Sequence, residues 1–467
     1  MSHFDDLNER LDSWIDGQRD EIIKSVQELI KIPSVLGEPA PGAPFGVETR
    51  KALDFFTSLA LCHDIPATHF DGYAAHIEIG SGEKLIGVLS HVDVVPEGND
   101  WKHDPFGGEI EDGKIFGRGA IDDKGPTIAA FYAILALKET GAPLSKRIRA
   151  IVGADEESGF RCMAYYFNHA EMPEFGFTPD GSFPAIYAEK GIASPVLTAK
   201  LEPLGDEAIK LLSMKAGTRS NMVPDRAEAI LQFDPLPIVP LQQSLEQFQG
   251  IETEVDIDRL IVRARGVGAH ASTPLEGTNA AFLLTKALLS ISNLTGSSRN
   301  IVEAVNAWSG DTTGAELGIA GSDGITTPLT SSLGVISTQE ESISLTFSVR
   351  YPVTWKGEDI SDRIKNSAGE YGFQLSSFSD SKPLFVPQND PNLAILLDVY
   401  RSETGDLGEP KTMGGGTYAR VLAKGVAFGA DFPGFPLIAH QADEFWYIED
   451  LIKATKIYAK SLARLAG

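Results

Sequence analysis

The sequence is short of cysteine and of positive charge, and both shortages exclude functions. Only Cys62 and Cys162 occur among the 467 residues, with no Cys-x-x-Cys pair, so neither a disulfide framework nor a cysteine-rich zinc site is expected. The chain has 40 lysines and arginines against 65 aspartates and glutamates, a formal net charge of −25. Nucleic acids and anionic membranes bind cationic surfaces, so neither is predicted as a partner.

Long apolar runs are missing as well. The N-terminus, MSHFDDLNERLDSW, lacks the basic start and apolar core of a signal peptide. No stretch approaches the roughly 20 apolar residues of a membrane span, because even LIGVLSHVDVV is interrupted by His91 and Asp93. Without a signal peptide or a membrane span, a cytoplasmic location is predicted.

Two common hydrolase signatures, GxSxG and HExxH, are also absent from the sequence.

The pattern of apolar residues predicts an α/β protein. Residues 1–30 have helical spacing and are predicted to form one helix. Short apolar runs such as Leu85–Leu89 and Arg149–Ala154 alternate with helical stretches such as Thr127–Lys138, which is typical of a sheet covered by helices. A chain of this length is expected to form two or three lobes.

The first candidate site follows the run that begins at Leu85. In His91-Val-Asp93 the two polar side chains lie on the same face of an extended chain. This arrangement suits a metal-binding histidine whose second nitrogen is held by a carboxylate. A histidine paired with an aspartate for structure alone is the alternative.

The second candidate is the segment GRGAIDDKG, in which Asp122 and Asp123 are adjacent at the start of a predicted helix. Two neighbouring carboxylates suit a metal bridge. The segment does not fit a phosphate loop, because it lacks the third glycine of GxGxxG and because Asp122 would repel a phosphate. An acidic helix cap is the alternative.

Three consecutive acids, Asp155-Glu156-Glu157, follow a further apolar run, and such a cluster is unfavourable unless positive charge lies nearby. With metals bound, one glutamate can be a ligand while its neighbour is the general base for a metal-bound water. Asp180 and His440 complete a set of oxygen and nitrogen donors that a pair of Zn²⁺ or Mn²⁺ ions accepts.

The spacing of these donors predicts a discontinuous domain. Four lie between residues 91 and 180, and the fifth is His440. If they share one site, residues 1–190 and 385–467 form one α/β catalytic domain and residues 191–384 are inserted in it. Such an insertion can close over the site as a lid, excluding water and positioning the scissile bond.

The motifs resemble those of the M20 metallopeptidase family, and among its members the PepV-type dipeptidases. Ten strings follow the family order from about residue 20 to the end: SHVDVVP (90–96), WKHDPF (101–106), GRGAIDDKGP (117–126), ADEESG (154–159), TPDGSFP (178–184), NMVPDRAEA (221–229), AHASTP (269–274), VRYP (349–352), GGGTYAR (414–420) and HQADEFWYIEDL (440–451).

The resemblance implies an α/β fold of two domains, a mixed-sheet catalytic domain with an inserted α+β lid. It implies that His91 and Asp180 hold one metal, that Glu157 and His440 hold the other, and that Asp122 bridges them and is followed by a cis peptide bond. The ions would be zinc, with manganese as the alternative.

The resemblance also implies roles for residues that hold no metal. Asp93 would orient the first histidine, and Glu156 would be the general base. The substrate would contact Asn221, His270, Arg350 and Gly416. Of these, Arg350 would clamp a free carboxylate and His270 would stabilise the oxyanion, although each residue taken alone also fits a structural role.

The predicted function is hydrolysis of the amide bond of unblocked dipeptides by a metal-bound hydroxide. An N-acyl-amino-acid deacylase or a carboxypeptidase of the same family is the alternative, as is a non-catalytic peptide-binding relative. The partner would be a small peptide. A monomer is predicted, because the insertion is large enough to replace a partner's lid, with a homodimer as the alternative.

Overall fold

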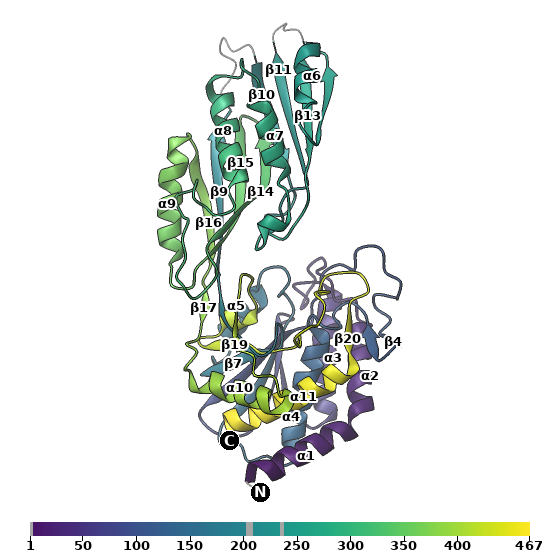
Figure 1. Cartoon of the computed structure of the whole chain (residues 1–467). Coiled ribbons are helices and arrows are strands. Elements are labelled where there is room, and N and C mark those ends of the chain that lie inside the picture. Colours follow the sequence, from purple (N-terminus) through teal and green to yellow (C-terminus); the bar gives the residue numbers. More distant parts are fainter. Residues whose placement is uncertain (1–2, 202–208, 234–237) are drawn as a thin grey trace. The chain divides into compact units, whose positions relative to one another are not determined.

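The computed structural model describes residues 3–201, 209–233 and 238–467 (Figure 1). The chain divides into two compact units. Unit 1 comprises Met1–Ala188, Leu384–Lys411 and Gly416–Gly467, and unit 2 comprises Glu189–Pro383 and Thr412–Gly415. None of the helices within the described ranges combines the length and the apolar character that a membrane span requires.

The N-terminal segment forms two helices, so the prediction of one helix over residues 1–30 is wrong. Helix α1 (His3–Gly17) ends at a glycine, and α2 (Arg19–Ile30) begins after Gln18, whose φ of −99° and ψ of 4° are not helical. Glycine is a poor helix former, so a break there costs little. Residues 1 and 2 lie outside the described residues.

Unit 1 is built on a nine-stranded mixed sheet with the strand order β1-β2-β6-β3-β7-β19-β8-β17, in which β18 also pairs with β8. Its strands are β1 (Ala67–Phe70), β2 (Ala74–Ile79), β3 (Leu85–His91), β6 (Arg147–Gly153), β7 (Phe175–Thr178), β8 (Ile186–Glu189), β17 (Leu384–Phe385), β18 (Lys411–Met413) and β19 (Gly425–Ala427). Strand β3 pairs in parallel with β6 and β7, and β7 pairs in parallel with β19. Every residue of β3 is buried, as expected for a central parallel strand.

Five further helices of unit 1 have buried apolar residues. They are α3 (Val47–Cys62), α4 (Lys124–Glu139), α5 (Arg161–Phe167), α10 (Pro391–Thr404) and α11 (Ile448–Ala466). Helix α4 packs against α11 and against strands β3 and β6, and it is buried along nearly its whole length. The start of α4 contacts the end of β3, where the Thr127 hydroxyl donates to the carbonyl of His91.

A small antiparallel sheet joins two distant parts of unit 1. It consists of β4 (Glu109–Glu111), β5 (Lys114–Phe116) and β20 (Phe445–Tyr447) in the order β20-β5-β4. Phe445 is paired with Phe116. The loop that follows β5 and the loop that precedes β20 are therefore neighbours.

Unit 2 contains an eight-stranded antiparallel sheet in the order β12-β13-β11-β10-β14-β15-β9-β16. Its elements are β9 (Gly191–Lys200), β10 (Ile209–Ala216), β11 (Arg226–Phe233), β12 (Ile251–Asp256), β13 (Arg259–Arg265), β14 (Thr330–Gln339), β15 (Ser342–Tyr351), β16 (Gln374–Ser381), α6 (Ile238–Leu245), α7 (Ala280–Leu288), α8 (Gly296–Gly310) and α9 (Gly357–Glu370). Buried and partly exposed residues alternate along β9, and buried leucines from β9, β11 and β15 join Trp308 of α8 in one core. The predicted α/β class, with a mixed sheet and a second α+β unit, is confirmed.

Candidate metal centre

The five predicted metal ligands lie on loops and strand ends of unit 1. His91 is the last residue of β3, Asp180 follows β7, and Glu157 follows β6. His440 lies on the loop between β19 and β20, and Asp122 precedes α4. Because β6, β3, β7 and β19 are parallel neighbours, their carboxyl ends meet at one edge of the sheet, which is where open α/β sheets bind ligands.

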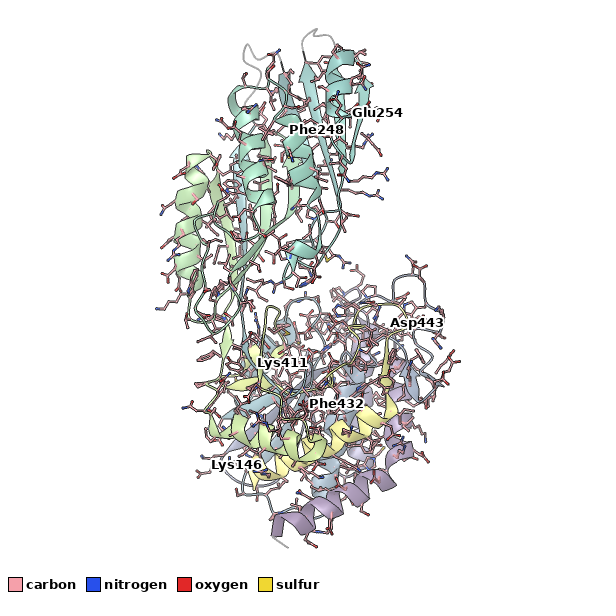
Figure 2. All side chains as sticks on the ribbon, in the orientation of Figure 1. Lys146, Phe248, Glu254, Lys411, Phe432 and Asp443 are labelled. Carbon is pink, nitrogen blue, oxygen red and sulfur yellow. The ribbon has the colours of Figure 1, made fainter. Side chains whose placement is uncertain are left out.

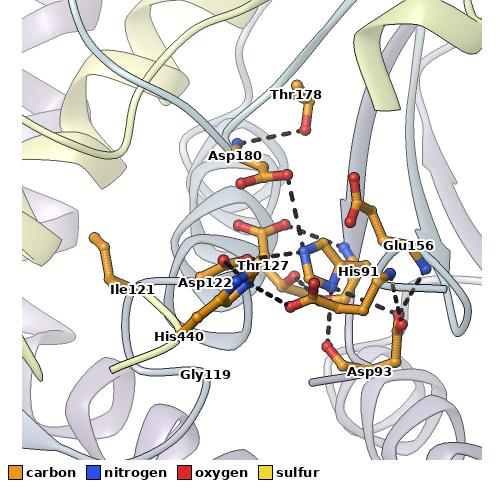
Figure 3. A network of polar contacts seen from close by, with 12 residues as sticks. His91, Asp93, Gly119, Ile121, Asp122, Thr127, Glu156, Thr178, Asp180 and His440 are labelled. Carbon is orange, nitrogen blue, oxygen red and sulfur yellow. Dashed lines mark hydrogen bonds and ion pairs between the residues drawn. The ribbon is translucent and has the colours of Figure 1, made fainter. Parts of the chain in front are cut away.

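The five side chains form two groups that share Asp122 (Figure 3). In the first group His91 Nε2 is 3.1 Å from Asp122 Oδ1 and 3.8 Å from Asp180 Oδ2. In the second, His440 Nε2 is 3.0 Å from Asp122 Oδ2 and 3.0 Å from Glu157 Oε1. Asp122 therefore turns one oxygen to each group, as a bridging ligand does. The peptide bond after Asp122 is cis, as the resemblance implied.

Both groups fit a transition-metal ion. Each offers one imidazole nitrogen and two carboxylate oxygens, with all donor atoms of a group within 4.8 Å of one another. Two donors bound tetrahedrally at about 2.1 Å from one zinc ion lie about 3.4 Å apart. The measured separations of 3.0–3.8 Å need little adjustment to surround an ion.

Burial and neighbouring charges shift the pKa values of the donor side chains away from their ordinary values. Burial, and then the charge of Asp122, raise the pKa of Asp180 to about 8. The same two causes raise the pKa of Glu157. Burial alone would lower the pKa of His440, but its hydrogen bonds with Asp122 and Glu157 outweigh burial and raise that pKa to about 11. Metal ions bind deprotonated carboxylates and neutral imidazoles, so cations would replace these protons.

Asp93 lies beside His91, where the sequence predicts it, and makes further contacts as well. His91 Nδ1 donates to the main-chain oxygen of Asp93 at 2.9 Å, while the nearest carboxylate oxygen is 3.5 Å away. The carboxylate instead accepts the N–H groups of Glu156 and Glu157, each at 3.1 Å. A carbonyl can only accept, so Nδ1 carries a proton, and Nε2 is the ring nitrogen directed at the metal group. The carboxylate of Asp93 holds the loop that carries Glu156 and Glu157.

Asp155 is not part of the metal groups. Its fully buried carboxylate accepts two hydrogen bonds from the guanidinium of Arg161, at 2.6 and 2.7 Å. Of the three consecutive acids, only Glu156 and Glu157 remain to act in the site. The arginine six residues downstream was the sequence signal for this pairing.

Several residues that the sequence analysis did not assign hold His91 in place. Tyr418 packs edge-on against its ring, at 5.9 Å between centroids. The carboxylate of Asp123 accepts the main-chain N–H of His91 at 3.1 Å, and the Thr127 hydroxyl donates to the main-chain carbonyl of His91 at 3.0 Å. Gly153 leaves room for Tyr418, because a Cβ there would lie 2.3 Å from the tyrosine oxygen.

The predicted substrate-binding residues divide between the units. Asn221 and His270 lie on paired segments of unit 2, where Met222 and His270 form a β-bridge and Ala271 donates to the Asn221 carbonyl at 2.8 Å. Both of these side chains are exposed. Arg350 belongs to β15 and is 6% exposed. Gly416 belongs to unit 1, and a Cβ there would lie 2.4 Å from the guanidinium carbon of Arg420.

Comparison with known proteins identifies the family to which the chain belongs. Residues 87–464 match the peptidase family M20/M25/M40. A Bacillus subtilis protein named "Putative dipeptidase YtjP" is 41% identical over 462 residues, covering 96% of this chain and 98% of that protein. A Staphylococcus epidermidis protein named "Putative dipeptidase" is 38% identical over 458 residues, covering 95% and 97%.

Solved structures share the fold at low sequence identity. Human carnosine dipeptidase 1 is 14% identical with a TM-score of 0.56, over 98% of this chain and 99% of that one. The dipeptidase Dug1p of Saccharomyces cerevisiae is 14% identical with a TM-score of 0.59, over 98% of both chains. The fold of this chain therefore has experimentally determined counterparts.

Replacing single donor residues should show which ion each donor group binds. Asp122→Ala should bind neither ion firmly, because Asp122 is common to both groups, whereas His440→Ala should keep one ion. Metal content after dialysis, measured by elemental mass spectrometry, checks this. His76→Gln is the control, since His76 is a partly buried histidine of β2 that belongs to neither group. Wild-type metal content in Asp122→Ala would contradict the bridging role.

Proposed function

The chain belongs to the peptidase family M20/M25/M40 and is thus a peptidase, and we propose that it is a dipeptidase that uses two divalent metal ions to hydrolyse unblocked dipeptides. The observation that carries this proposal is the pair of donor groups sharing Asp122. The relatives named as dipeptidases support it, because they align over nearly the whole chain.

The proposed ligands of one ion are His91 and Asp180, those of the other are Glu157 and His440, and Asp122 bridges the two. When bound, the ions, zinc or alternatively manganese, would act as Lewis acids that lower the pKa of water towards neutrality and polarise the scissile carbonyl. The chain's contribution is to hold the five donors in place around them.

Glu156 is proposed as the general base. It is adjacent to the ligand Glu157 but belongs to neither donor group, and its main chain is held by Asp93. A carboxylate so placed takes a proton from the attacking water and returns it to the leaving amine nitrogen. A protein that only bound peptides or metal would not need this additional carboxylate.

Unit 2 is proposed to bind the substrate. Residues 191–384 would form the lid of a catalytic domain made of residues 1–190 and 385–467. The planar guanidinium of Arg350 suits bidentate pairing with a free carboxylate, and the imidazole of His270 suits a developing oxyanion. Asn221 and the main chain at Gly416 would complete the contacts with the substrate.

The proposal also covers assembly and location. An eight-stranded sheet forms within one copy of unit 2, so we assign a monomer rather than a homodimer. A cytoplasmic location is part of the proposal, and the bacterial relatives named as putative dipeptidases support it.

The function is tested with a panel of dipeptides and matched N-acyl amino acids. Protein is stripped of metal, reloaded with Zn²⁺ or Mn²⁺, and assayed for release of amino acids. Metal-restored cleavage of the dipeptides alone is expected. Cleavage of the acyl compounds alone would identify a deacylase instead. Metal binding without cleavage of either would indicate a peptide-binding protein.

Replacing the general base should stop turnover without releasing metal. Glu156→Gln keeps the size of the side chain but cannot take a proton, so kcat should fall by about 10²–10⁴-fold. Kinetics and metal content are measured together, with Glu83→Gln, an exposed glutamate of unit 1, as the control. Substantial activity in metal-replete Glu156→Gln would refute the assignment.

Loss of Arg350 should affect recognition of the carboxylate selectively. Hydrogen bonds to charged groups contribute about 1.5–3 kcal/mol, so Arg350→Ala should raise KM for free dipeptides by about 10–150-fold. KM for the corresponding C-terminal amides should change little. Arg263→Ala, which removes an exposed arginine from the same sheet, is the control, and unfolding is monitored in both variants. An equal loss with amides would exclude the clamp.

A further inference from the structure

Two side chains outside both donor groups connect the loops that carry Asp122 and His440. We infer that Glu444 and Arg118 are positioning residues that form a buried cross-link and thereby preset the Asp122–Glu157–His440 donor group. The inference rests on the proposed metal-dependent function, because it concerns how one metal group is held in place.

Glu444 holds the loop of Asp122. Its side chain is fully buried, and Oε1 accepts the N–H groups of Gly119 at 3.0 Å, Ile121 at 3.1 Å and Asp122 at 3.3 Å. The carbonyl of Glu444 also accepts the N–H of Gly117 at 2.9 Å. One carboxylate oxygen thus fixes the main chain of the bridging ligand and of the turn before it.

Arg118 holds the loop of His440 in return. Its side chain is 1% exposed, and Nη1 donates to Glu444 Oε2 at 2.6 Å and to the carbonyl of Gln441 at 3.2 Å. Nη2 donates to the carbonyl of Glu97 at 3.1 Å. Gln441 directly follows His440, so the guanidinium binds the main chain next to the second ligand.

Each loop therefore supplies a side chain that binds the main chain of the other, although these partners are more than 300 residues apart in sequence. The pairing of β20 with β5 brings the loops together but ends at Phe445 and Phe116, before either ligand. The Arg118–Glu444 pair continues the connection from this small sheet to the ligands themselves.

The conformation of His440 is a second, independent observation. Its φ is 67°, a left-handed conformation that a residue with a Cβ keeps only when its surroundings hold it. Asp443, labelled in Figure 2, has a φ of 55° and accepts the N–H groups of Lys102 and His103 at 2.9 and 3.1 Å. The loop is thus held on both sides of Gln441 and Ala442, and the Nε2 of His440 is directed at Asp122 and Glu157.

A purely structural role would give a different result from a positioning role. A buried ion pair can often be replaced by apolar residues without loss of stability, so stability alone does not explain a carboxylate that accepts three N–H groups beside a ligand. If the pair positions ligands, its loss weakens the metal group that contains His440 more than the group of His91 and Asp180. If it only stabilises the fold, the two metal affinities remain as they are.

The test is calorimetric titration of metal-stripped protein with Zn²⁺, with thermal unfolding measured in parallel. Wild type should bind two ions. Glu444→Gln keeps the shape of the side chain but loses its charge, and the affinity of one ion should fall by about 10–100-fold. The affinity of the other ion should fall by less, since it shares only Asp122 with the affected group. Arg118→Lys keeps the charge but not the planar fork, so it should give a smaller loss at the same ion.

Lys460→Met is the matched control. Lys460 is 4% exposed and makes ion pairs of 2.8 and 2.7 Å with Asp12 and Glu403 in unit 1, and it belongs to neither donor group. It should unfold at a lower temperature and bind both ions as wild type does. If Glu444→Gln also unfolds at a lower temperature but binds both ions with wild-type affinity, the inference is overturned. If Glu444→Gln does not fold, unchanged affinities in Arg118→Lys would overturn it instead. Absence of metal binding by wild type would refute the proposed function itself.

Discussion

Several carboxylates lie close together at one edge of the unit 1 sheet and repel one another. The surrounding structure has to neutralise this negative charge. Asp122, Glu157 and Asp180 lie within a few ångströms of two histidines and are largely buried. Two unit charges about 4 Å apart interact by about 4 kcal/mol at an effective dielectric constant of about 20. Such a cluster persists only if cations or shared protons neutralise it, and this requirement connects the fold to metal-dependent chemistry.

The neighbouring acids are neutralised by other means, so similar sequence motifs have different roles. Asp155 pairs with Arg161, and Glu444 pairs with Arg118. Asp93 and Asp123 accept main-chain N–H groups from the loops that carry the ligands. These pairings leave the carboxylates of the donor groups available for metal and at the same time fix the loops on which they lie.

The proposed chemical and substrate-binding roles divide between the two units of the chain. All five donors and Glu156 belong to unit 1, where parallel strands end side by side. Asn221, His270 and Arg350 belong to unit 2, which has its own core and its own antiparallel sheet. With the roles proposed above, changes in unit 2 would alter substrate contacts and leave the core of unit 1 unchanged.

The sequence by itself determined the α/β class and the strand-end positions of His91, Glu157 and Asp180, because burial patterns and strand ends are local properties of the chain. It did not determine the break at Gln18 or the hydrogen bonds that Asp93 accepts from Glu156 and Glu157. Nothing local separates Asp443 from Glu444, yet one accepts bonds from the Lys102 loop and the other holds the Asp122 loop. Only the tertiary structure decided these roles, because the hydrogen bonds join segments hundreds of residues apart that become neighbours when the sheets form.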